Sequence, residues 1–210
     1  MSIQVVDKSI TDVDGVYASS ITVKEADSNL RMSYLFVPNT YSSAGVFTQH
    51  HFSASSVNYT KKCIRNHTIK AVLITAGNAN VATGKQGDDM TKSLAKKVAQ
   101  SFHINKHEVA IAATGIIGKP LPADLDQKLD PLLGDRFKKE SALFEKGILT
   151  TDKGPKTVFV EAKVGKKLIS IAGVTKGCGM IEPNMATTLG FLVTNAAIST
   201  THLNQCLKKA

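Results

Sequence analysis

Two uninterrupted apolar runs, each ending at a glycine, constrain the fold more than any other feature of this sequence. Residues 70–77 read KAVLITAG, and residues 107–115 read HEVAIAATG. Apolar runs of this length without polar alternation are typical of strands that are buried on both faces of a sheet. The sequence therefore predicts a mixed α/β fold in which helices cover the sheets.

Three helical segments are predicted between and after these strands. The segment 88–102 carries lysines on one face and an apolar stripe on the other. The stripe consists of Met90, Leu94, Val98 and Phe102. Leucines over 125–133 indicate a second helix, broken at Pro131. A third helix is predicted over 138–149, with Gly147 near its C-terminal end.

Further strands are predicted from β-rich segments. Residues 30–37 form one, residues 156–174 form a hairpin with its turn at 164–165, and residues 187–195 form another short buried strand. The sequence contains no internal repeat and no low-complexity linker. Residues 1–210 are therefore predicted to form a single domain.

The charge of the chain argues against one class of function. Lys and Arg outnumber Asp and Glu, 26 to 17, which gives a formal net charge of +9. The lysines are scattered singly or in pairs, without a basic run interleaved with aromatic residues, and there is no Trp. Net charge alone indicates solubility and weak association, so we do not predict nucleic-acid binding.

Cysteine and histidine usage indicates neither a metal site nor a disulfide framework. Cys63, Cys178 and Cys206 are widely spaced and form no C-x-x-C pair. His50 and His51 lack a matching ligand set, so we expect them at the surface. No segment reaches the roughly 18 apolar residues of a membrane helix, and the N-terminus lacks the pattern of a signal peptide. We therefore expect a cytoplasmic protein without a membrane partner.

Two glycine-rich turns follow the buried strands. TAGNANVATGKQG, at 75–87, lacks the spacing and the final Ser or Thr of a phosphate-binding loop, and we predict a sharp strand-to-helix turn. AATGIIGKPLP, at 112–122, places Thr114 and Gly115 at the end of a strand. A threonine hydroxyl or N–H beside an unobstructed glycine N–H suits the stabilisation of an oxyanion. Any turn at the end of a strand offers similar groups, so this signal is weak by itself.

The segment 175–195, TKGCGMIEPNMATTLGFLVTN, combines bends, a small residue and two hydroxyls. A threonine hydroxyl needs a base to act as a nucleophile, and an N-terminal threonine can use its own α-amine, whose ordinary pKa is about 7.7 to 8.0. This chemistry requires a cut between Ala186 and Thr187. The small Ala186 leaves the carbonyl open to attack, and bends at Pro183 and Asn184 would strain the bond. A plain loop that leads into a strand is the alternative on spacing alone.

Several motifs occur in an order that is typical of one family. They are GNAN, TG, ATGIIGKPLP, ILTTD and KGCGMIEPNMATTLGF. In this order they resemble the ornithine acetyltransferase (glutamate N-acetyltransferase) family of arginine biosynthesis, over residues 13–198. The last block is long and specific, whereas residues 1–60 match the family in character only.

The resemblance implies an enzyme that cuts itself before it acts. The cleavage site would be the bond between Ala186 and Thr187. The new N-terminal Thr187 would then take the acetyl group from N-acetylornithine and pass it to glutamate. No metal and no resident cofactor are implied, although some family members also use acetyl-CoA as a donor.

The resemblance also assigns roles to individual residues. Thr114 and Gly115 would form the oxyanion site. The substrate would contact Thr150, with Thr151 as the neighbouring alternative, together with Lys176 and the nucleophile itself. A flexible cation such as Lys176 is suited to a substrate carboxylate.

The implied fold is a helix–sheet–sheet–helix sandwich, similar to but topologically distinct from N-terminal-nucleophile hydrolases. The α chain would end at Ala186 and the β chain would begin at Thr187, in an α2β2 heterotetramer. Members are about twice as long, so we expect this chain to carry only the start of the β chain and to be neither cleaved nor active without the rest. At the positions of Thr188 and Gly190, members of the resembled family more often have Met and Ala. Both positions follow the expected nucleophile, so we expect the difference to affect packing more than chemistry.

Two other functions remain beside the acetyltransferase. One is a self-processing N-terminal-nucleophile amidohydrolase or aminopeptidase, which would release acetate with or without glutamate. The other is a non-catalytic remnant or basic binding module. The threonine-based block and the ATGIIG turn favour the transferase.

Overall fold

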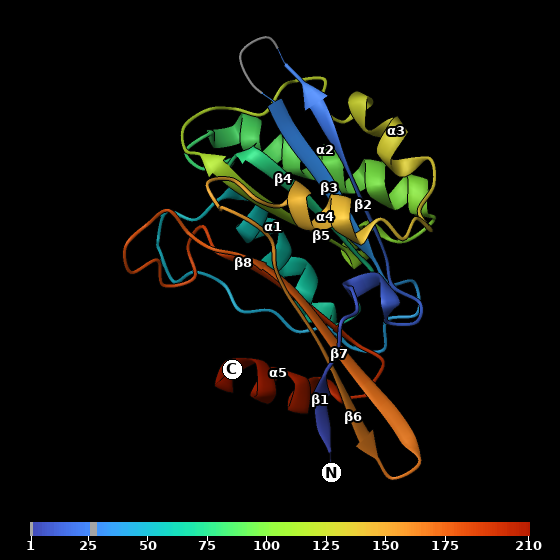
Figure 1. The fold of residues 1–210 in the computed structure, drawn as a ribbon. Coiled ribbons are helices and arrows are strands. Elements are labelled where there is room, and N and C mark those ends of the chain that lie inside the picture. Colours follow the sequence, from blue (N-terminus) through green and yellow to red (C-terminus); the bar gives the residue numbers. More distant parts are fainter. Residues whose placement is uncertain (1, 26–28) are drawn as a thin grey trace.

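The structure is a computed structural model that describes residues 2–25 and 29–210. Strands in this part of the chain form two four-stranded sheets (Figure 1). The strands are β1 (Ile3–Val5), β2 (Tyr17–Lys24), β3 (Asn29–Phe36), β4 (Ala71–Asn78), β5 (Val109–Ile116), β6 (Lys156–Val164), β7 (Lys167–Lys176) and β8 (Leu189–Thr194). The α-helices are α1 (Ser55–Cys63), α2 (Gly84–Phe102), α3 (Asp130–Leu133), α4 (Ser141–Gly147) and α5 (Thr200–Lys209). Short 3-10 helices are η1 (Ile10–Asp12), η2 (Ile64–Asn66), η3 (Lys106–Glu108) and η4 (Gln127–Leu129).

The first sheet has the strand order β2-β3-β4-β5. Strands β2, β3 and β4 are antiparallel neighbours, whereas β4 and β5 are parallel. Parallel strands need a long crossover, and α2 provides it. The apolar run in β4 is buried on both faces, as the sequence predicts: Leu73 and Ile74 point to opposite sides and are both fully buried.

The second sheet has the order β1-β6-β7-β8, and all of its neighbours are antiparallel. The predicted hairpin over 156–174 is confirmed as β6 and β7, which pair from Lys156 with Thr175 to Val164 with Lys167. Gly165 turns the chain with a φ of +60°, a conformation that glycine adopts without steric cost.

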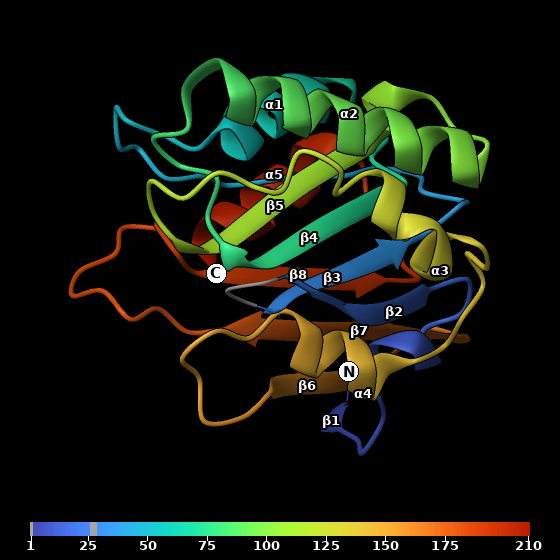
Figure 2. The same cartoon turned by 90° about the horizontal axis from the view of Figure 1, so that it is seen from above.

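Two hydrophobic cores separate the layers of the fold (Figure 2). One core lies between the first sheet and the helices, and the predicted apolar stripe of α2 packs into it. The other lies between the sheets, where Leu35 and Ile74 of the first sheet meet Phe159 and Val174 of the second. The predicted mixed α/β sandwich of two sheets with helices is therefore confirmed.

The second sheet turns an apolar face away from the core. Phe159 is buried between the sheets, but its neighbour Val158 points outward and is 46% exposed, as the alternation of a strand requires. Ile171 and Leu192 on the next two strands are exposed as well. Gly173 lies between them, since a Cβ there would approach both Val158 and Leu192 within 3.4 Å. We call this surface the outer face.

Two predicted elements differ from the structure. The strand over 187–195 exists as β8, but it is not buried, because only one of its faces packs into the core while Leu192 on the other is 60% exposed. The helix over 125–133 is not broken at Pro131. Instead η4 ends before it and Pro131 lies in the first turn of α3, where a missing N–H costs nothing.

The other predicted helices are confirmed with small changes in their limits. The helix over 88–102 is α2, which begins earlier, at Gly84, and the helix over 138–149 is α4, which ends at Gly147. The sequence patterns described above did not predict β1, β2, α1 or α5.

Candidate functional site

The loop from β7 to β8 has an unusual backbone. Left-handed φ values occur at four of its non-glycine residues: Glu182 (48°), Asn184 (40°), Met185 (69°) and Thr187 (58°). A β-branched residue such as Thr187 is a genuine outlier in this region, and such a conformation costs about 1–3 kcal/mol. The N–H of Ala186 donates to the carbonyl of Pro183 at 2.7 Å, which closes a tight turn. The Ala186–Thr187 bond thus lies between a closed turn and a strained residue.

The hydroxyl of Thr187 is buried, and no group among the described residues forms a hydrogen bond with its Oγ1. Leaving a buried hydroxyl without a partner costs about 1–3 kcal/mol. Such groups are rare in folded proteins and call for an explanation. A nucleophile that awaits its substrate is one explanation that fits this position.

Lys176 is the residue that contacts Thr187. It ends β7 on the side that faces the first sheet, and it is 1% exposed. Its Nζ donates to the carbonyl oxygen of Thr187 at 3.0 Å and to that of Gly177 at 2.7 Å. Burial lowers the pKa of Lys176 below its ordinary value, and the nearby carboxylate of Asp152 opposes this effect. An ammonium has three N–H groups, so one remains for another acceptor.

The two candidate substrate threonines lie beside this loop. Thr150 is half-buried between α4 and β6, and its backbone forms a hydrogen bond with the Asp152 carboxylate. Thr151 is exposed, and its hydroxyl oxygen would lie 3.4 Å from a Cβ placed on Gly179. Both threonines therefore adjoin the loop, and the hydroxyl of Thr151 faces its glycine-rich start.

The predicted oxyanion pair lies at the carboxyl end of β5. Thr114 is 2% exposed, and Ile74 and Ala112 place this side of the sheet in the core between the two sheets. Gly115 has a φ of +129°, and a Cβ there would lie 2.1 Å from the carbonyl oxygen of Gly77. Glycine is therefore required at position 115 by both conformation and space.

The structure brings some of the predicted residues together but not all. Lys176 and Thr187 are joined by a hydrogen bond. The carboxyl end of β5 and the loop 177–188 lie on the same side of the molecule in Figures 1 and 2. However, none of the interactions found among the described residues links Thr114 or Gly115 to Thr187.

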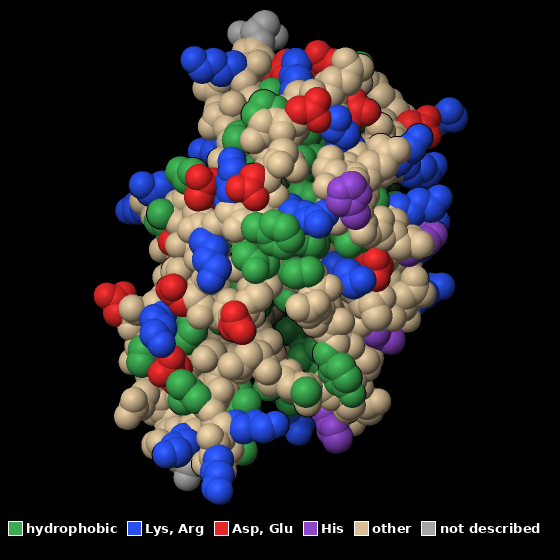
Figure 3. Space-filling view, turned by 90° about the vertical axis from the view of Figure 1, so that its right-hand side faces the viewer, with side chains coloured by type: hydrophobic (Ala, Val, Ile, Leu, Met, Phe, Trp, Pro, Cys, Tyr) green, Lys and Arg blue, Asp and Glu red, His purple; other side chains and the backbone are tan. Residues whose placement is uncertain are grey.

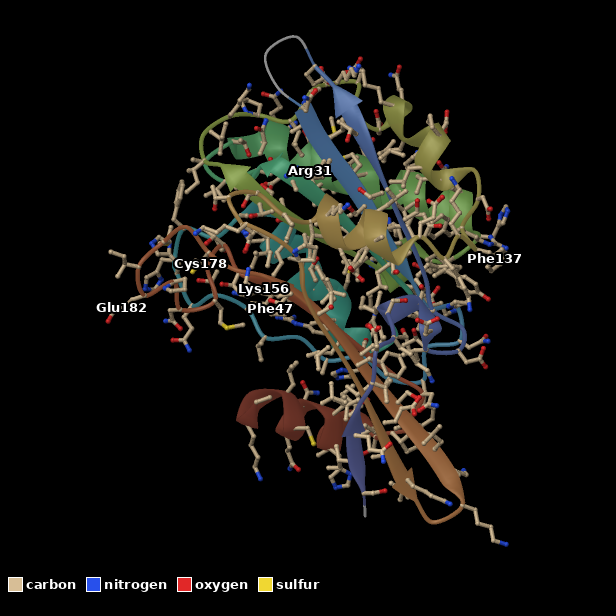
Figure 4. All side chains as sticks on the ribbon, in the orientation of Figure 1. Arg31, Phe47, Phe137, Lys156, Cys178 and Glu182 are labelled. Atoms are coloured by element: carbon tan, nitrogen blue, oxygen red, sulfur yellow. The ribbon has the colours of Figure 1, made fainter. Side chains whose placement is uncertain are left out.

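Sequence reasoning missed one residue of the site, Asp152. Its carboxylate accepts a hydrogen bond from the N–H of Gly177 at 2.7 Å, at the point where the loop leaves β7. In Figure 4 the loop carries Cys178 and Glu182 at its left, and Lys156 lies near its base. Asp152 belongs to the ILTTD motif, so an acidic residue directly after the two candidate threonines was the available signal.

The glycine-rich turn over 75–87 serves the structure, as predicted. The side-chain amide of Asn80 donates to Thr91 Oγ1 at 3.0 Å and to the carbonyl of Gly87 at 3.2 Å, which fixes the start of α2. Two surface hollows of about 510 and 180 Å³ adjoin α2 and the segment 52–58. Neither hollow is lined by a predicted site residue.

The other groups considered as sites, in the part of the chain that the structure describes, are a metal cluster, the histidine pair, the cysteines and the surface charges. Within residues 2–25 and 29–210, no group of three His, Cys, Asp or Glu side chains could hold a metal ion. His50 and His51 are exposed, as predicted. The Cys178 thiol donates to the carbonyl of Met180 at 3.2 Å. Lys and Arg are interspersed with Asp and Glu on the side shown in Figure 3, rather than gathered in one basic patch. None of the described helices combines the length and hydrophobicity needed to cross a bilayer.

Comparison with known proteins identifies relatives over nearly the whole chain. The model of the ArgJ family matches residues 16–210. The chain is 38% identical over 202 residues to the arginine biosynthesis bifunctional protein ArgJ of Oceanobacillus iheyensis, covering 95% of this chain and 49% of that protein. It is 38% identical over 182 residues to a glutamate N-acetyltransferase of Methanothermobacter thermautotrophicus, and the match covers 84% of this chain and 45% of that protein. The chain spans about half the length of the curated relatives it matches.

Solved structures share the fold. The arginine biosynthesis bifunctional protein ArgJ of Bacillus halodurans has a TM-score of 0.77 and 31% identity, covering 88% of this chain and 98% of that one. Ornithine acetyltransferase of Mycobacterium tuberculosis, solved with ornithine, has a TM-score of 0.74 and 27% identity, and the match covers 88% of this chain and 100% of the solved chain. Since 88% of 210 residues is about 185, each solved chain has about 185 to 190 residues.

Proposed function

Because this chain belongs to the ArgJ family, we propose that it carries the nucleophile and the oxyanion site of an acetyltransferase of arginine biosynthesis. The acetyl donor is N-acetylornithine and the acceptor is glutamate, in line with the names of its relatives. The observation that carries the proposal is the buried hydroxyl of Thr187, which has no hydrogen-bond partner among the described residues and is held in a strained loop beside a buried cation.

Self-cleavage comes first. Thr187 Oγ1 attacks the carbonyl carbon of Ala186, the peptide C–N bond breaks, and the hydroxyl proton passes to the nitrogen of Thr187. Water then hydrolyses the resulting ester, which leaves a carboxylate on Ala186 and a free amine and hydroxyl on Thr187. The left-handed conformation of Thr187 supports this step, because strain in the uncut chain is released by cleavage.

Acetyl transfer then uses the same hydroxyl twice. Oγ1 attacks the acetyl carbonyl of N-acetylornithine, its proton passes through the α-amine to the departing ornithine nitrogen, and the amide bond breaks. The amine of glutamate attacks the acetyl ester, and a proton returns to Oγ1. Thr114 and Gly115 stabilise the oxyanion of both steps from the end of β5. The free N–H of Lys176 and the hydroxyl of Thr150 bind the substrate.

A second polypeptide portion completes this site. The exposed outer face of the second sheet supports the idea, since exposed apolar patches of this kind mark interaction surfaces. The half-length match to the curated relatives agrees with it. The solved chains are also close in length to the 186 residues before the predicted cut. We therefore propose that residues 1–210 form one domain whose outer face meets a C-terminal β chain in an α2β2 assembly.

The remaining proposals concern the cofactor, the acetyl donor and the cellular compartment of the reaction. The acetyl-threonine mechanism needs no resident cofactor, and acetyl-CoA is an alternative donor to the same hydroxyl. We place the reaction in the cytoplasm, because Cys63, Cys178 and Cys206 are all free thiols, as is usual in a reducing compartment.

The test is a pair of variants at the nucleophile. The chain is mixed with the C-terminal half of the Oceanobacillus iheyensis relative, then assayed with N-acetylornithine with and without glutamate, and weighed by intact mass spectrometry. Thr187→Ala should abolish cleavage and the acetyl-enzyme, whereas Thr187→Ser should retain part of both. Normal cleavage and turnover in Thr187→Ala would refute the proposal. Acetate release that does not depend on glutamate would identify a hydrolase instead.

A further inference from the structure

The carboxylate of Asp152 forms hydrogen bonds with several parts of the candidate site. Its side chain is 5% exposed. Its Oδ1 accepts hydrogen bonds from the N–H of Gly177 at 2.7 Å and from the Nζ of Lys156 at 2.9 Å, and the backbone of Thr150 also bonds to the carboxylate. One carboxylate thus joins the segment after α4, the start of β6 and the residue that follows β7.

The second carboxylate oxygen of Asp152 faces the buried lysine. Oδ2 is buried and has no hydrogen-bond partner among the described residues, and it lies 4.0 Å from the Nζ of Lys176. An isolated buried ammonium would lose its proton rather than remain charged. Opposite charges at this distance in a dry environment attract strongly, so each of these groups compensates the other.

The charged groups that act on Lys176 among the described residues are Asp152, from the segment between α4 and β6, and Lys156, at the start of β6. Burial lowers the pKa of Lys176, the charge of Asp152 raises it and the charge of Lys156 lowers it. The Cys178 thiol of the adjoining loop also lies nearby and donates a hydrogen bond to the carbonyl of Met180. For Asp152, burial raises the pKa, but hydrogen bonds from Lys156, Gly177 and Thr150, together with the charge of Lys176, outweigh burial and hold it below its ordinary value. Asp152 is therefore ionised at neutral pH.

We propose that Asp152 is a positioning residue, which keeps the Lys176 ammonium charged and directed at the carbonyl of Thr187. It acts through Lys176 and Gly177 and touches no reacting atom. The inference rests on the proposed function only in giving Thr187 the role of nucleophile. The ionic arrangement itself can be tested whatever reaction the protein performs.

The first test measures the protonation of Lys176 directly. Asp152→Asn keeps the size of the side chain and an acceptor for the N–H of Gly177, but it removes the negative charge. The ¹³Cε chemical shift of Lys176, followed by NMR, should titrate at a pH lower by roughly one unit or more than in the unaltered chain. The matched control is Asp124→Asn, which removes a 52% exposed carboxylate that pairs with Lys128 at 3.1 Å and should cause no shift. An unchanged titration in Asp152→Asn would overturn the proposal.

The second test reads activity, with the C-terminal half of a relative supplied. Asp152→Asn should slow cleavage and acetyl transfer at least about tenfold at neutral pH, because a misplaced group near the reacting atoms costs this much or more. The alkaline limb of its pH profile should move in the same direction as the Lys176 titration. If the unaltered chain neither cleaves nor transfers, the proposed function fails while the titration still decides the role of Asp152. Full activity in a variant with a shifted titration would show that Asp152 does not position the site.

A third measurement covers the case in which Asp152→Asn folds poorly. The double variant Asp152→Asn, Lys176→Met removes both buried charges. If the aspartate compensates the lysine, the double variant should unfold at a higher urea concentration than Asp152→Asn alone. A midpoint that is equal or lower would show that the two groups are not coupled, and would overturn the proposal.

Discussion

The ammonium of Lys176, the last residue of β7, donates a hydrogen bond of 3.0 Å to the carbonyl oxygen of Thr187, which lies 11 residues later in the loop that bends repeatedly before β8. This bond fixes the proposed nucleophile from its C-terminal side and leaves the carbonyl of Ala186 outside the contact. The cation therefore holds Thr187 in place without contacting the bond that we propose is cut.

The first prediction concerns the removal of this cation. Lys176→Met leaves the buried Asp152 carboxylate with only the exposed Lys156 as a counter-charge, and removing the buried partner of an ion pair typically costs about 3–5 kcal/mol of unfolding free energy. The matched control is Lys156→Met, since Lys156 is 54% exposed and bonds to the same carboxylate. An exposed partner contributes about 0–1 kcal/mol. Urea unfolding of both variants checks the contrast, and equal losses would contradict it.

The second prediction separates catalysis from binding at the end of β5. If Thr114 donates to the oxyanion, Thr114→Ala lowers the turnover number by about 10²–10³ and leaves KM nearly unchanged. Steady-state kinetics with N-acetylornithine and glutamate provides the measurement. A raised KM at an unchanged turnover number would make Thr114 a binding residue instead.

The third prediction uses three glycines as a graded series. In Gly154→Ala the new Cβ enters open space and the backbone φ is not left-handed, so the stability of the fold should hardly change. Gly118→Ala also meets open space, but at a φ of +82°, so it should lose about 1 kcal/mol or more through backbone strain. Gly115→Ala has both the strain and a 2.1 Å clash with Gly77, so it should lose the most. Thermal unfolding ranks the three variants, and any other order would contradict the backbone geometry and free space described at these three glycines.

Local patterns explain what the sequence could and could not predict. The periodic stripe of α2 and the continuous apolar runs of β4 and β5 are each contained within one segment of sequence, so these elements were predicted correctly. The burial of β8 was predicted wrongly, because the exposure of its second face depends on what lies opposite that face and not on the sequence of the strand itself. The contact between Asp152 and Gly177 spans 25 residues, and only the register of β6 with β7 brings the two together.

The fourth prediction concerns acid stability. Hydrogen bonds from the backbone and the hydroxyl of Ser9 lower the pKa of Asp12 below its ordinary 3.8, and this pair closes η1 beside the core residue Ile10. The unfolded chain then binds more protons near pH 3.8, so the stabilisation is complete above that pH and is lost as the pH falls through the folded-state pKa. The stability difference between the unaltered chain and Asp12→Asn should therefore shrink from about pH 5 to about pH 2. A difference that stays constant would contradict this assignment.

The last prediction compares a residue of the outer face with a residue of the core in the same sheet, on β8 and β6. Leu192→Lys changes a side chain that is 60% exposed, so the isolated chain should keep its stability within about 0.5 kcal/mol. Phe159→Ala, at 2% exposure, should cost about 3–5 kcal/mol. When the C-terminal half of a relative is added, the unaltered chain should bind it and then cleave at Ala186, whereas Leu192→Lys should fail to bind, because a charge would be buried in an apolar contact. Size-exclusion chromatography and intact mass follow both steps. Cleavage of the 210-residue chain without any partner would show that the second half is not needed for the cut, and normal binding by Leu192→Lys would show that the outer face does not contact it.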